Sequence, residues 1–361
     1  MKVARASVSS VAGQMPVPSA NARHVWRERR GLVLRLWDDE GRVGTGESSP
    51  LPGFSPESLE SARAAFGVEP WQDFELDLST PVLPQVRHLV ARVDEAVPSA
   101  RFALETALLD LVGQRLGRPL WALLSEEGTA RPTQVAALID AGEPDPIGAA
   151  QLAVRAGHRT IKIKIGLRLE QELKLLAGIR AELGSEVKIR LDANRALAGP
   201  HLADRLALIA RMEPELVEEP APPEAIEALG DVGVSLAFDE SLMEDVEATF
   251  RWVGEGGPWR YVVLKPSVLG GLLRCAELAR WCRARGAIPI VSHTLEGPVA
   301  FAAISALAVS LPGPSVTAGL GPHPGLDAWS KERPPMLQGA TVVPWEEPGL
   351  GFPRASEADE R

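Results

Sequence analysis

Five charged residues stand at the ends of short apolar segments in the middle of the chain, about one strand–helix unit apart: Lys164, Asp192, Glu218, Asp239 and Lys265. Carboxylate oxygens are the ligands that Mg²⁺ and Mn²⁺ prefer, whereas zinc usually recruits His or Cys, and neither is placed here. Any one of the acids alone is equally well explained as a helix cap or a surface ion pair. Three in register favour a site for Mg²⁺, with Mn²⁺ as an alternative.

The lysines are suited to proton transfer at carbon. Lys162 and Lys164 alternate with Ile161, Ile163 and Ile165, which is the two-residue period of a β-strand. Such a strand alone is also typical of a surface sheet, but the charged strand ends that follow favour lysines that face inward. A lysine beside another cation in a partly dry cleft has its free-amine form favoured, so it accepts a proton near neutral pH. A nearby metal ion neutralises the charge that appears on a carboxylate when its α-carbon loses a proton.

Eight strands are expected to position these residues. Short apolar segments alternate with helical ones in the ranges 135–139, 160–165, 188–194, 215–220, 235–241, 261–266, 288–292 and 315–320. Regular βαβα order predicts an α/β fold with a parallel sheet, and no G-x-G-x-x-G motif follows any of these strands. We therefore predict a (β/α)7β TIM-like barrel, whose site forms at the carboxyl ends of the strands. In a ring of eight, the strands of Lys164 and Lys265 lie on opposite sides of the mouth.

The sequence before residue 129 predicts a separate α+β capping domain. Strands are expected at 3–11, 31–37 and 43–47, with a glycine turn between the last two, and a helical pattern covers 99–124. The region 14–30 is too irregular to assign. The predicted domains are a cap (1–128), a barrel (129–331) and a C-terminal segment (332–361) that returns to the cap and ends in a mobile tail.

Composition limits the function classes. The 361 residues are 45% hydrophobic and 24% charged, with a formal net charge of −10, which argues against a nucleic-acid or anionic-membrane surface. The apolar runs are too short to cross a bilayer, and the N-terminus lacks the core of a secretory signal. We expect a cytoplasmic protein that acts on a small-molecule carboxylate, without nucleic-acid or membrane partners. Cys275 and Cys282 are seven residues apart on one helix, too far for a disulfide, and are expected to be core thiols.

Several motifs resemble, in order and spacing, those of the muconate-cycloisomerase-like subgroup of the enolase superfamily: Lys162-Ile163-Lys164, Leu191-Asp192-Ala193-Asn194, Val217-Glu218-Glu219-Pro220, Asp239-Glu240-Ser241 and Leu264-Lys265-Pro266. The segment 103–111 is similar to the helix that closes the N-terminal domain of that subgroup. The segment 46–55 resembles, more narrowly, the o-succinylbenzoate synthase family, the dehydratases of menaquinone biosynthesis. The likeness covers nearly the whole chain.

The resemblance implies a Mg²⁺-dependent lyase. The expected reaction is the syn-dehydration of 2-succinyl-6-hydroxy-2,4-cyclohexadiene-1-carboxylate to o-succinylbenzoate through an enediolate. It implies that Asp192, Asp239 and Glu218, rather than Glu219, bind the metal. The three lysines are each implied to have a role: Lys164 removes the α-proton and returns it to the departing hydroxyl, Lys265 stabilises the enediolate from the opposite face, and Lys162 tunes Lys164.

The resemblance also implies substrate contacts, in which the cap loop 49–54 and the loop before Gly31 close over the ligand. The expected contact residues are Arg190, Asn194, Ser292, Thr294, Gly319, Pro50 and Leu51. His293 stands where small residues are common in this family, so it either reshapes the pocket or is a buried structural histidine. Glu240 is not expected to be a ligand, because strand alternation points it away from Asp239.

Three other functions remain open at this stage. An N-succinylamino-acid racemase or a dipeptide epimerase would use the same two lysines as acid and base on the two faces of one carbon. A Schiff-base lyase would instead use Lys164 or Lys265 as a nucleophile on a carbonyl. A barrel that only binds its ligand is disfavoured by the presence together of both lysines and three acids.

Overall fold

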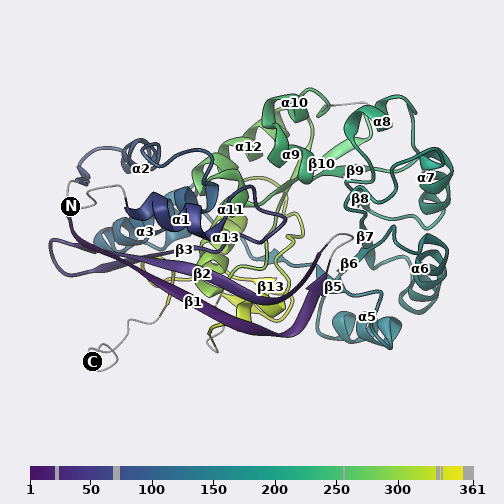
Figure 1. Cartoon of the computed structure of the whole chain (residues 1–361), viewed down its shortest axis with the longest axis horizontal. Helices are drawn as coiled ribbons and strands as arrows, with labels where there is room; N and C mark the ends of the chain where they lie inside the picture. Colours follow the sequence, from purple (N-terminus) through teal and green to yellow (C-terminus); the bar gives the residue numbers. More distant parts are fainter. Residues whose placement is uncertain (21–23, 68–73, 255–256, 331–333, 335, 353–361) are drawn as a thin grey trace.

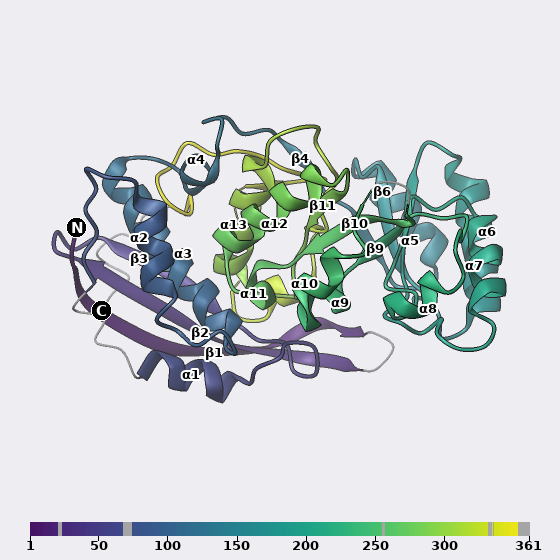
Figure 2. The ribbon, with the colours of Figure 1, turned by 90° about the horizontal axis from the view of Figure 1, so that it is seen from above.

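The computed structural model describes residues 1–20, 24–67, 74–254, 257–330, 334 and 336–352. It consists of a barrel with an N-terminal sheet and its helices at one side (Figures 1 and 2). The C-terminal tail, predicted to be mobile, lies outside the described residues from position 353 onward, and so do residues 21–23 of the loop before Gly31. No helix in the described ranges is long and apolar enough to cross a membrane.

The capping domain is built on an antiparallel sheet in the order β1-β2-β3. Its strands are β1 (Val3–Ala20), β2 (Val25–Asp38) and β3 (Val43–Ser48). Leu34 on β2 is fully buried, and at Gly46 a Cβ atom would lie 1.9 Å from the carbonyl oxygen of Ala103. Glycine on β3 therefore lets the sheet lie directly against a helix. The helices of this domain are α1 (Leu59–Gly67), α2 (Val82–Val90), α3 (Pro98–Leu116) and α4 (Leu120–Leu124).

The first two strands are longer than the sequence predicts. The region 14–30, left unassigned from the sequence, continues as a two-stranded ribbon in which Gln14 pairs with Glu28 and Ser19 with Trp26, with one register shift between these pairs. Figure 1 shows the ribbon extending from the cap towards the strands of the barrel. Most of its side chains are exposed. The few buried side chains of the ribbon, Met15, Trp26 and Arg29, do not follow a two-residue alternation, so the sequence carries no periodic signal for it.

The barrel sheet is parallel, in the order β11-β10-β9-β8-β7-β6-β5. Residues 318–319 contribute the predicted eighth strand as two isolated parallel bridges, Val135 with Ala318 and Ser292 with Gly319, so the last segment meets both edges of the sheet. The structure confirms the predicted fold class. The strands are β5 (Ala137–Ile139), β6 (Thr160–Lys164), β7 (Lys188–Asp192), β8 (Leu216–Glu218), β9 (Leu236–Phe238), β10 (Trp259–Leu264) and β11 (Ile288–Val291).

Helices follow the barrel strands and cover the sheet from outside, as Figure 2 shows for α5 to α8. They are α5 (Pro146–Arg155), α6 (Leu169–Leu183), α7 (Leu202–Ala210), α8 (Pro223–Glu227), α9 (Glu240–Glu244), α10 (Val246–Phe250), α11 (Pro266–Leu269), α12 (Leu272–Ala284) and α13 (Pro298–Ser310). A small second sheet joins β4 (Thr133–Gln134), β12 (Leu337–Gln338) and β13 (Thr341–Val342), and a 3₁₀ helix, η2, spans Pro324–Asp327.

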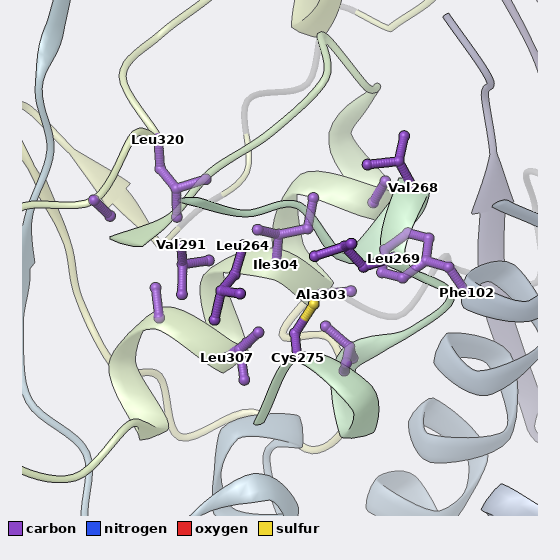
Figure 3. Packing of buried hydrophobic residues seen from close by; sticks show 14 of the residues in the cluster. Phe102, Leu264, Val268, Leu269, Cys275, Val291, Ala303, Ile304, Leu307 and Leu320 are labelled. Atoms are coloured by element: carbon purple, nitrogen blue, oxygen red, sulfur yellow. The ribbon is translucent and has the colours of Figure 1, made fainter. Parts of the chain in front are cut away.

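One continuous core crosses from the cap into the barrel. Figure 3 shows Phe102 of α3 beside Leu269 of α11, with Leu264 and Ile304 of the barrel in the same cluster. Cys275 belongs to this core, and both cysteines are free and buried, as predicted. The C-terminal segment also reaches the cap, because the Leu350 backbone N–H donates to Asp110 of α3 at 3.0 Å. The domain boundary near residue 128 stays a prediction.

A buried carboxylate also joins the two parts. Glu105 of α3 accepts hydrogen bonds from the backbone N–H groups of Leu272 and, at 3.1 Å, Leu273 at the start of α12. At Gly271, where φ is 138°, a Cβ atom would lie 2.7 Å from a Glu105 oxygen, so glycine makes this approach possible. Burial raises the pKa of Glu105 from 4.5 to about 7, although the two backbone hydrogen bonds oppose the rise.

We expect this carboxyl group to make stability depend on pH. A raised pKa means that the folded state holds the proton more tightly than the unfolded chain, so this contribution is present below pH 4.5 and is lost as pH rises to about 7. The linked loss is on the order of 3 kcal/mol. Glu105→Gln keeps the acceptor oxygen and should flatten the dependence of unfolding free energy on pH in this window, measured by urea titration at several pH values.

The control is Glu247→Gln, which replaces an exposed acid on α10 and should follow the wild-type pH profile. An unchanged slope in Glu105→Gln would remove Glu105 as the cause.

Candidate active site

The strand pattern of β6 brings its two lysines to the inside of the barrel mouth. Ile161 and Ile163 are fully buried in the core, and Lys162 and Lys164 alternate with them. The Lys162 ammonium lies 2.8 Å from both carboxylate oxygens of Glu218 and 2.9 Å from Oδ2 of Asp192. Lys162 therefore contacts the acids at the ends of the next two strands, β7 and β8.

The remaining charges complete one cluster at the carboxyl ends of adjacent strands. Asp192 ends β7, Glu218 ends β8, Asp239 follows β9 and Lys265 follows β10, and all four side chains are buried. Lys265 donates to Oδ2 of Asp239. Lys164 instead donates from Nζ to the carbonyl oxygen of Ala20, at 2.9 Å, at the end of strand β1 in the capping ribbon. The five charged residues singled out from the sequence thus lie together.

The surroundings separate the three lysines by pKa. Burial lowers the pKa of Lys164, and the positive charges of Lys162 and Lys265 lower it further, although Asp192 opposes them. Burial also acts to lower the pKa of Lys162 and of Lys265, but the carboxylates that they contact outweigh it, and both pKa values are raised. Lys164 is therefore the lysine of the three that gives up its proton most readily, which is what a general base requires.

The acids fit a divalent cation by their chemistry. In the described part of the chain no group of three or more His, Cys, Asp or Glu side chains is spaced to hold a metal ion as it stands; the acids are paired with Lys162 and Lys265 instead. The donors are all carboxylate oxygens, the set that Mg²⁺ prefers. Oδ1 of Asp239 is buried and has no hydrogen-bond partner among the described residues, so it is an acceptor left available to a cation.

The second acid of the Glu218–Glu219 pair has a different position. Glu219 accepts backbone N–H groups of Asp239 at 3.0 Å and Ser241 at 2.9 Å, and it pairs with Arg195 at 3.3 Å. Its φ is 39°, a left-handed conformation that only surrounding contacts maintain in a residue with a side chain. Glu218 contacts Lys162, whereas Glu219 binds the backbone after β9; the choice of Glu218 as the metal ligand stays a prediction.

A cavity lies over the cluster and is lined from both domains. Its wall consists of Ser19, Trp26, Leu51, Phe54, Ala136, Leu138, Lys162, Lys164, Asp192, Asn194, Asp239, Lys265, Ser292, His293, Thr294, Leu295, Gly319, Gly321, Pro322 and His323. Trp26, Leu51 and Phe54 come from the cap, and the Lys265 ammonium lies 4.5 Å from the centre of the Phe54 ring. The cap therefore closes the site with apolar side chains.

The predicted substrate contacts divide into two groups. The structure brings to the cavity wall Asn194, Ser292, Thr294, Gly319 and Leu51. It does not bring Arg190 there, because this side chain is 3% exposed and is bound to Glu215 at 2.6 Å and to the Thr317 carbonyl at 2.8 Å. Pro50 is also absent from the wall; its carbonyl accepts a hydrogen bond from Arg29 at 3.1 Å.

The sequence does not single out Trp26, Leu295, His323 or Arg29. Phe54 lies in the loop 49–54 that is expected to close over the ligand, although it is not named among the contact residues. Trp26 and Arg29 lie on the ribbon, where the sequence has no period to follow. Leu295 has a φ of 62°, and leucine is not a residue type that predicts this left-handed conformation.

Arg29 fastens the cap loop to the barrel. Its side chain is 1% exposed and donates to the carbonyl oxygens of Leu295 at 2.9 Å, Pro50 at 3.1 Å and Ser49. Burial lowers the pKa of Arg29, and two nearby carboxylates oppose this change. One of them, Glu47, accepts the backbone N–H of Gly297 at 2.7 Å. The buried guanidinium of Arg29 thus links the loops that carry Leu51 and Leu295, and the Glu47 carboxylate adds a second link beside it.

Arg29→Met is expected to raise KM by about 10- to 100-fold and to cost about 3 kcal/mol of unfolding free energy, because it leaves three carbonyls and two carboxylates without their donor or charge partner. Steady-state kinetics and urea unfolding measure the two effects. Arg29→Lys keeps the charge but not the planar fork, so it should restore only part of the loss. The control is Arg27→Met, an exposed arginine of the same strand. If Arg29→Met had the KM of the wild-type enzyme, Arg29 would not be needed to hold the cap loop over the substrate.

Family models match both parts of the chain. Residues 20–111 match the MenC N-terminal domain, and residues 148–357 match the enolase C-terminal domain-like family. The o-succinylbenzoate synthase of Klebsiella pneumoniae is 31% identical over 336 residues, which are 90% of this chain and 91% of the relative. That of Thermosynechococcus vestitus is 33% identical over 301 residues, 80% and 83% of the two chains.

Solved structures agree with the fold. A dipeptide epimerase from Methylococcus capsulatus, complexed with Mg and the dipeptide L-Arg-D-Lys, has a TM-score of 0.83 and 26% identity, and the match covers 97% of this chain and 99% of that one. An N-succinyl Arg/Lys racemase from Bacillus cereus has a TM-score of 0.82 at 20% identity, covering 97% and 95%, and supports the fold alone. The resemblance found in the sequence is confirmed: the chain belongs to the o-succinylbenzoate synthase family of the enolase superfamily and is an enzyme of the lyase type.

Proposed function

We propose that the enzyme catalyses the Mg²⁺-dependent syn-dehydration of 2-succinyl-6-hydroxy-2,4-cyclohexadiene-1-carboxylate to o-succinylbenzoate in menaquinone biosynthesis. The observation that carries the proposal is a cavity lined by Lys164, whose pKa is lowered, together with Lys265, Asp192 and Asp239. The third buried acid, Glu218, is joined to this group through Lys162. The similarity to o-succinylbenzoate synthases over nine-tenths of the chain selects this substrate.

The lysines account for the proton transfers. Lys164 in its free-amine form takes the proton from the carbon next to the ring carboxylate. Lys265, which is charged because its pKa is raised, stabilises the negative charge of the resulting enediolate. Lys164 then gives the same proton to the departing hydroxyl group, so one water leaves and the ring becomes aromatic.

The acids and Lys162 set the electrostatics. Asp192, Glu218 and Asp239 would hold Mg²⁺, which supplies positive charge for the carboxylate whose α-carbon is deprotonated. Lys162 keeps a positive charge beside Lys164, which favours the free-amine form of Lys164. Trp26, Leu51 and Phe54 exclude water from the enediolate.

A second candidate is an N-succinylamino-acid racemase or dipeptide epimerase. Lys164 and Lys265 stand on strands four apart in a ring of eight, an arrangement suited to reaching both faces of one carbon. The dipeptide epimerase with a TM-score of 0.83 has the same fold. The racemase or epimerase requires the same base and the same cation as the dehydratase. The two activities can therefore be distinguished only by testing which substrate is converted.

The test is incubation of the purified protein with the cyclohexadiene precursor and, separately, with N-succinyl amino acids in D₂O. We expect loss of precursor absorbance, abolished by EDTA and restored by Mg²⁺. Deuterium exchange at the α-carbon with loss of optical rotation, without precursor turnover, would replace the dehydratase by the racemase. Inactivation by borohydride in the presence of substrate, with no effect of EDTA, would indicate a Schiff-base lyase instead.

A further inference from the structure

One side chain on the barrel wall of the cavity keeps a hydrogen-bond donor that the protein does not use. The hydroxyl of Ser292 donates to the Gly319 carbonyl at 3.2 Å, and that of Thr294 donates to Glu296 at 2.5 Å. His293 stands between them in sequence and lines the same cavity. Its Nε2 has no hydrogen-bond partner within the described ranges, and it is not among the buried orphan atoms. Nε2 is therefore accessible from the cavity.

The other ring nitrogen fixes which atom carries the proton. Nδ1 of His293 accepts the backbone N–H of Leu295 at 3.1 Å, so in the neutral ring the proton is on Nε2. The ring stacks on His323, with centroids 3.9 Å apart and planes inclined by 27°. Burial and the positive charges of the three lysines lower the pKa of His293 to about 3. The cavity thus has an oriented, neutral N–H donor.

We propose that His293 determines substrate specificity by donating its Nε2–H to a second carboxylate, remote from the reacting carbon. The inference rests on the proposed function and deepens it, since the succinyl group of the proposed substrate carries such a carboxylate. The reacting carboxylate is met by the lysines and the three acids. Asn194, a side-chain amide on the wall, donates one of its two N–H groups to Glu240 at 2.8 Å. Of the three consecutive wall residues 292–294, His293 is the one whose side-chain donor is not given to another described residue, and we assign it to the remote acceptor.

A donor that faces a cavity selects ligands, because a bound ligand without an acceptor leaves the donor unpaired and shielded from water. A ligand with an oxygen acceptor at this end makes the hydrogen bond, whereas a ligand without one leaves a desolvated N–H behind. Benzoate and o-succinylbenzoate differ in this respect, because benzoate lacks the succinyl arm. His293 should therefore contribute to the affinity for o-succinylbenzoate and not to that for benzoate.

Three variants distinguish the role of the Nε2–H donor from that of the stacked ring. His293→Phe keeps a ring that can stack on His323 but loses both nitrogens. His293→Asn keeps an acceptor near Nδ1 for the Leu295 N–H and loses the Nε2 donor, whereas His293→Gln places an amide donor near Nε2. The control is His201→Phe, whose histidine side chain is 70% exposed. The measurements are kcat and KM for the precursor, and Kd of o-succinylbenzoate and of benzoate by calorimetry on the Mg²⁺-supplemented protein.

We expect the Phe and Asn variants to raise KM and the Kd of o-succinylbenzoate by about 10- to 100-fold, the effect of losing a hydrogen bond to a charged oxygen. Their kcat should stay within a few-fold and their benzoate affinity should not change, and His293→Gln should recover most of the loss. Wild-type KM in the Asn variant, or an equal loss of benzoate affinity, would overturn the inference and leave the dehydratase intact. Absence of precursor turnover by the wild-type enzyme would overturn both.

Discussion

Replacing Lys164 by alanine is expected to lower kcat for the dehydration by about 10³- to 10⁴-fold, because the same amine removes the α-proton and returns it to the hydroxyl. The affinity for o-succinylbenzoate should stay within a few-fold, since the cation site and His293 are untouched. The readouts are precursor absorbance under saturating substrate and product Kd by calorimetry. A loss confined to kcat would identify Lys164 as a participant in the chemical step.

The wild-type pH profile gives an independent check on the same residue. The working form of Lys164 is the free amine, so kcat/KM should fall as pH drops through its pKa. That pKa is lowered from 10.5 by burial and by the neighbouring lysines, so the midpoint of this acidic limb should lie below 10.5. The limb should be missing from the residual activity of Lys164→Ala. Lys174→Ala, an exposed lysine of α6, is the matched control, and substantial turnover by Lys164→Ala would remove this lysine from the mechanism.

Glu218→Gln is expected to weaken Mg²⁺ binding and to lower activity by about 10²-fold or more. The substitution preserves the shape of the side chain but removes one of the three negative charges that a divalent cation requires. It also leaves Lys162 with a single carboxylate partner, Asp192. Calorimetric titration of the protein with MgCl₂ measures the first effect, and turnover at increasing Mg²⁺ measures the second. Wild-type enzyme stripped with EDTA should show the same loss of activity, reversed by Mg²⁺.

The control for this experiment is Glu227→Gln, which neutralises an exposed acid on α8 and should bind Mg²⁺ as the wild-type protein does. Undiminished Mg²⁺ affinity in Glu218→Gln would mean that the acids serve another purpose, such as balancing the lysines. Weakened Mg²⁺ binding with full activity would mean instead that the cation is not needed for turnover.

The sequence predicted the charged cluster because parallel strands end at the same edge of a sheet. Lys164, Asp192 and Glu218 are register partners in β6, β7 and β8, so their convergence follows from strand order alone. The same argument failed for Arg190. Strand alternation places Arg190 on the inward face of β7 with Asp192. Alternation does not say how far along the barrel axis a side chain lies. Arg190 is two residues before Asp192, so it lies inside the barrel below the mouth, bound to Glu215.

The parts that the sequence did not predict depend on contacts between distant segments. Arg29 acts through carbonyl groups of Ser49, Pro50 and Leu295, and any residue type offers a carbonyl. Glu105 of the cap contacts the start of α12 in the barrel, so this contact depends on how the two domains pack together. Neither arrangement has a period or a spacing in the sequence, because both are produced by the packing of one domain on the other.

The contact between the Ala20 carbonyl and Lys164 places a strand of the cap directly beside the proton-transfer amine. The proton-transfer groups stand at the ends of buried parallel strands, whereas the segment that reaches Lys164 from the cap is a hairpin with mostly exposed side chains. We therefore expect substitutions at the exposed positions of this hairpin to change the space above the amine while the charged cluster keeps its contacts.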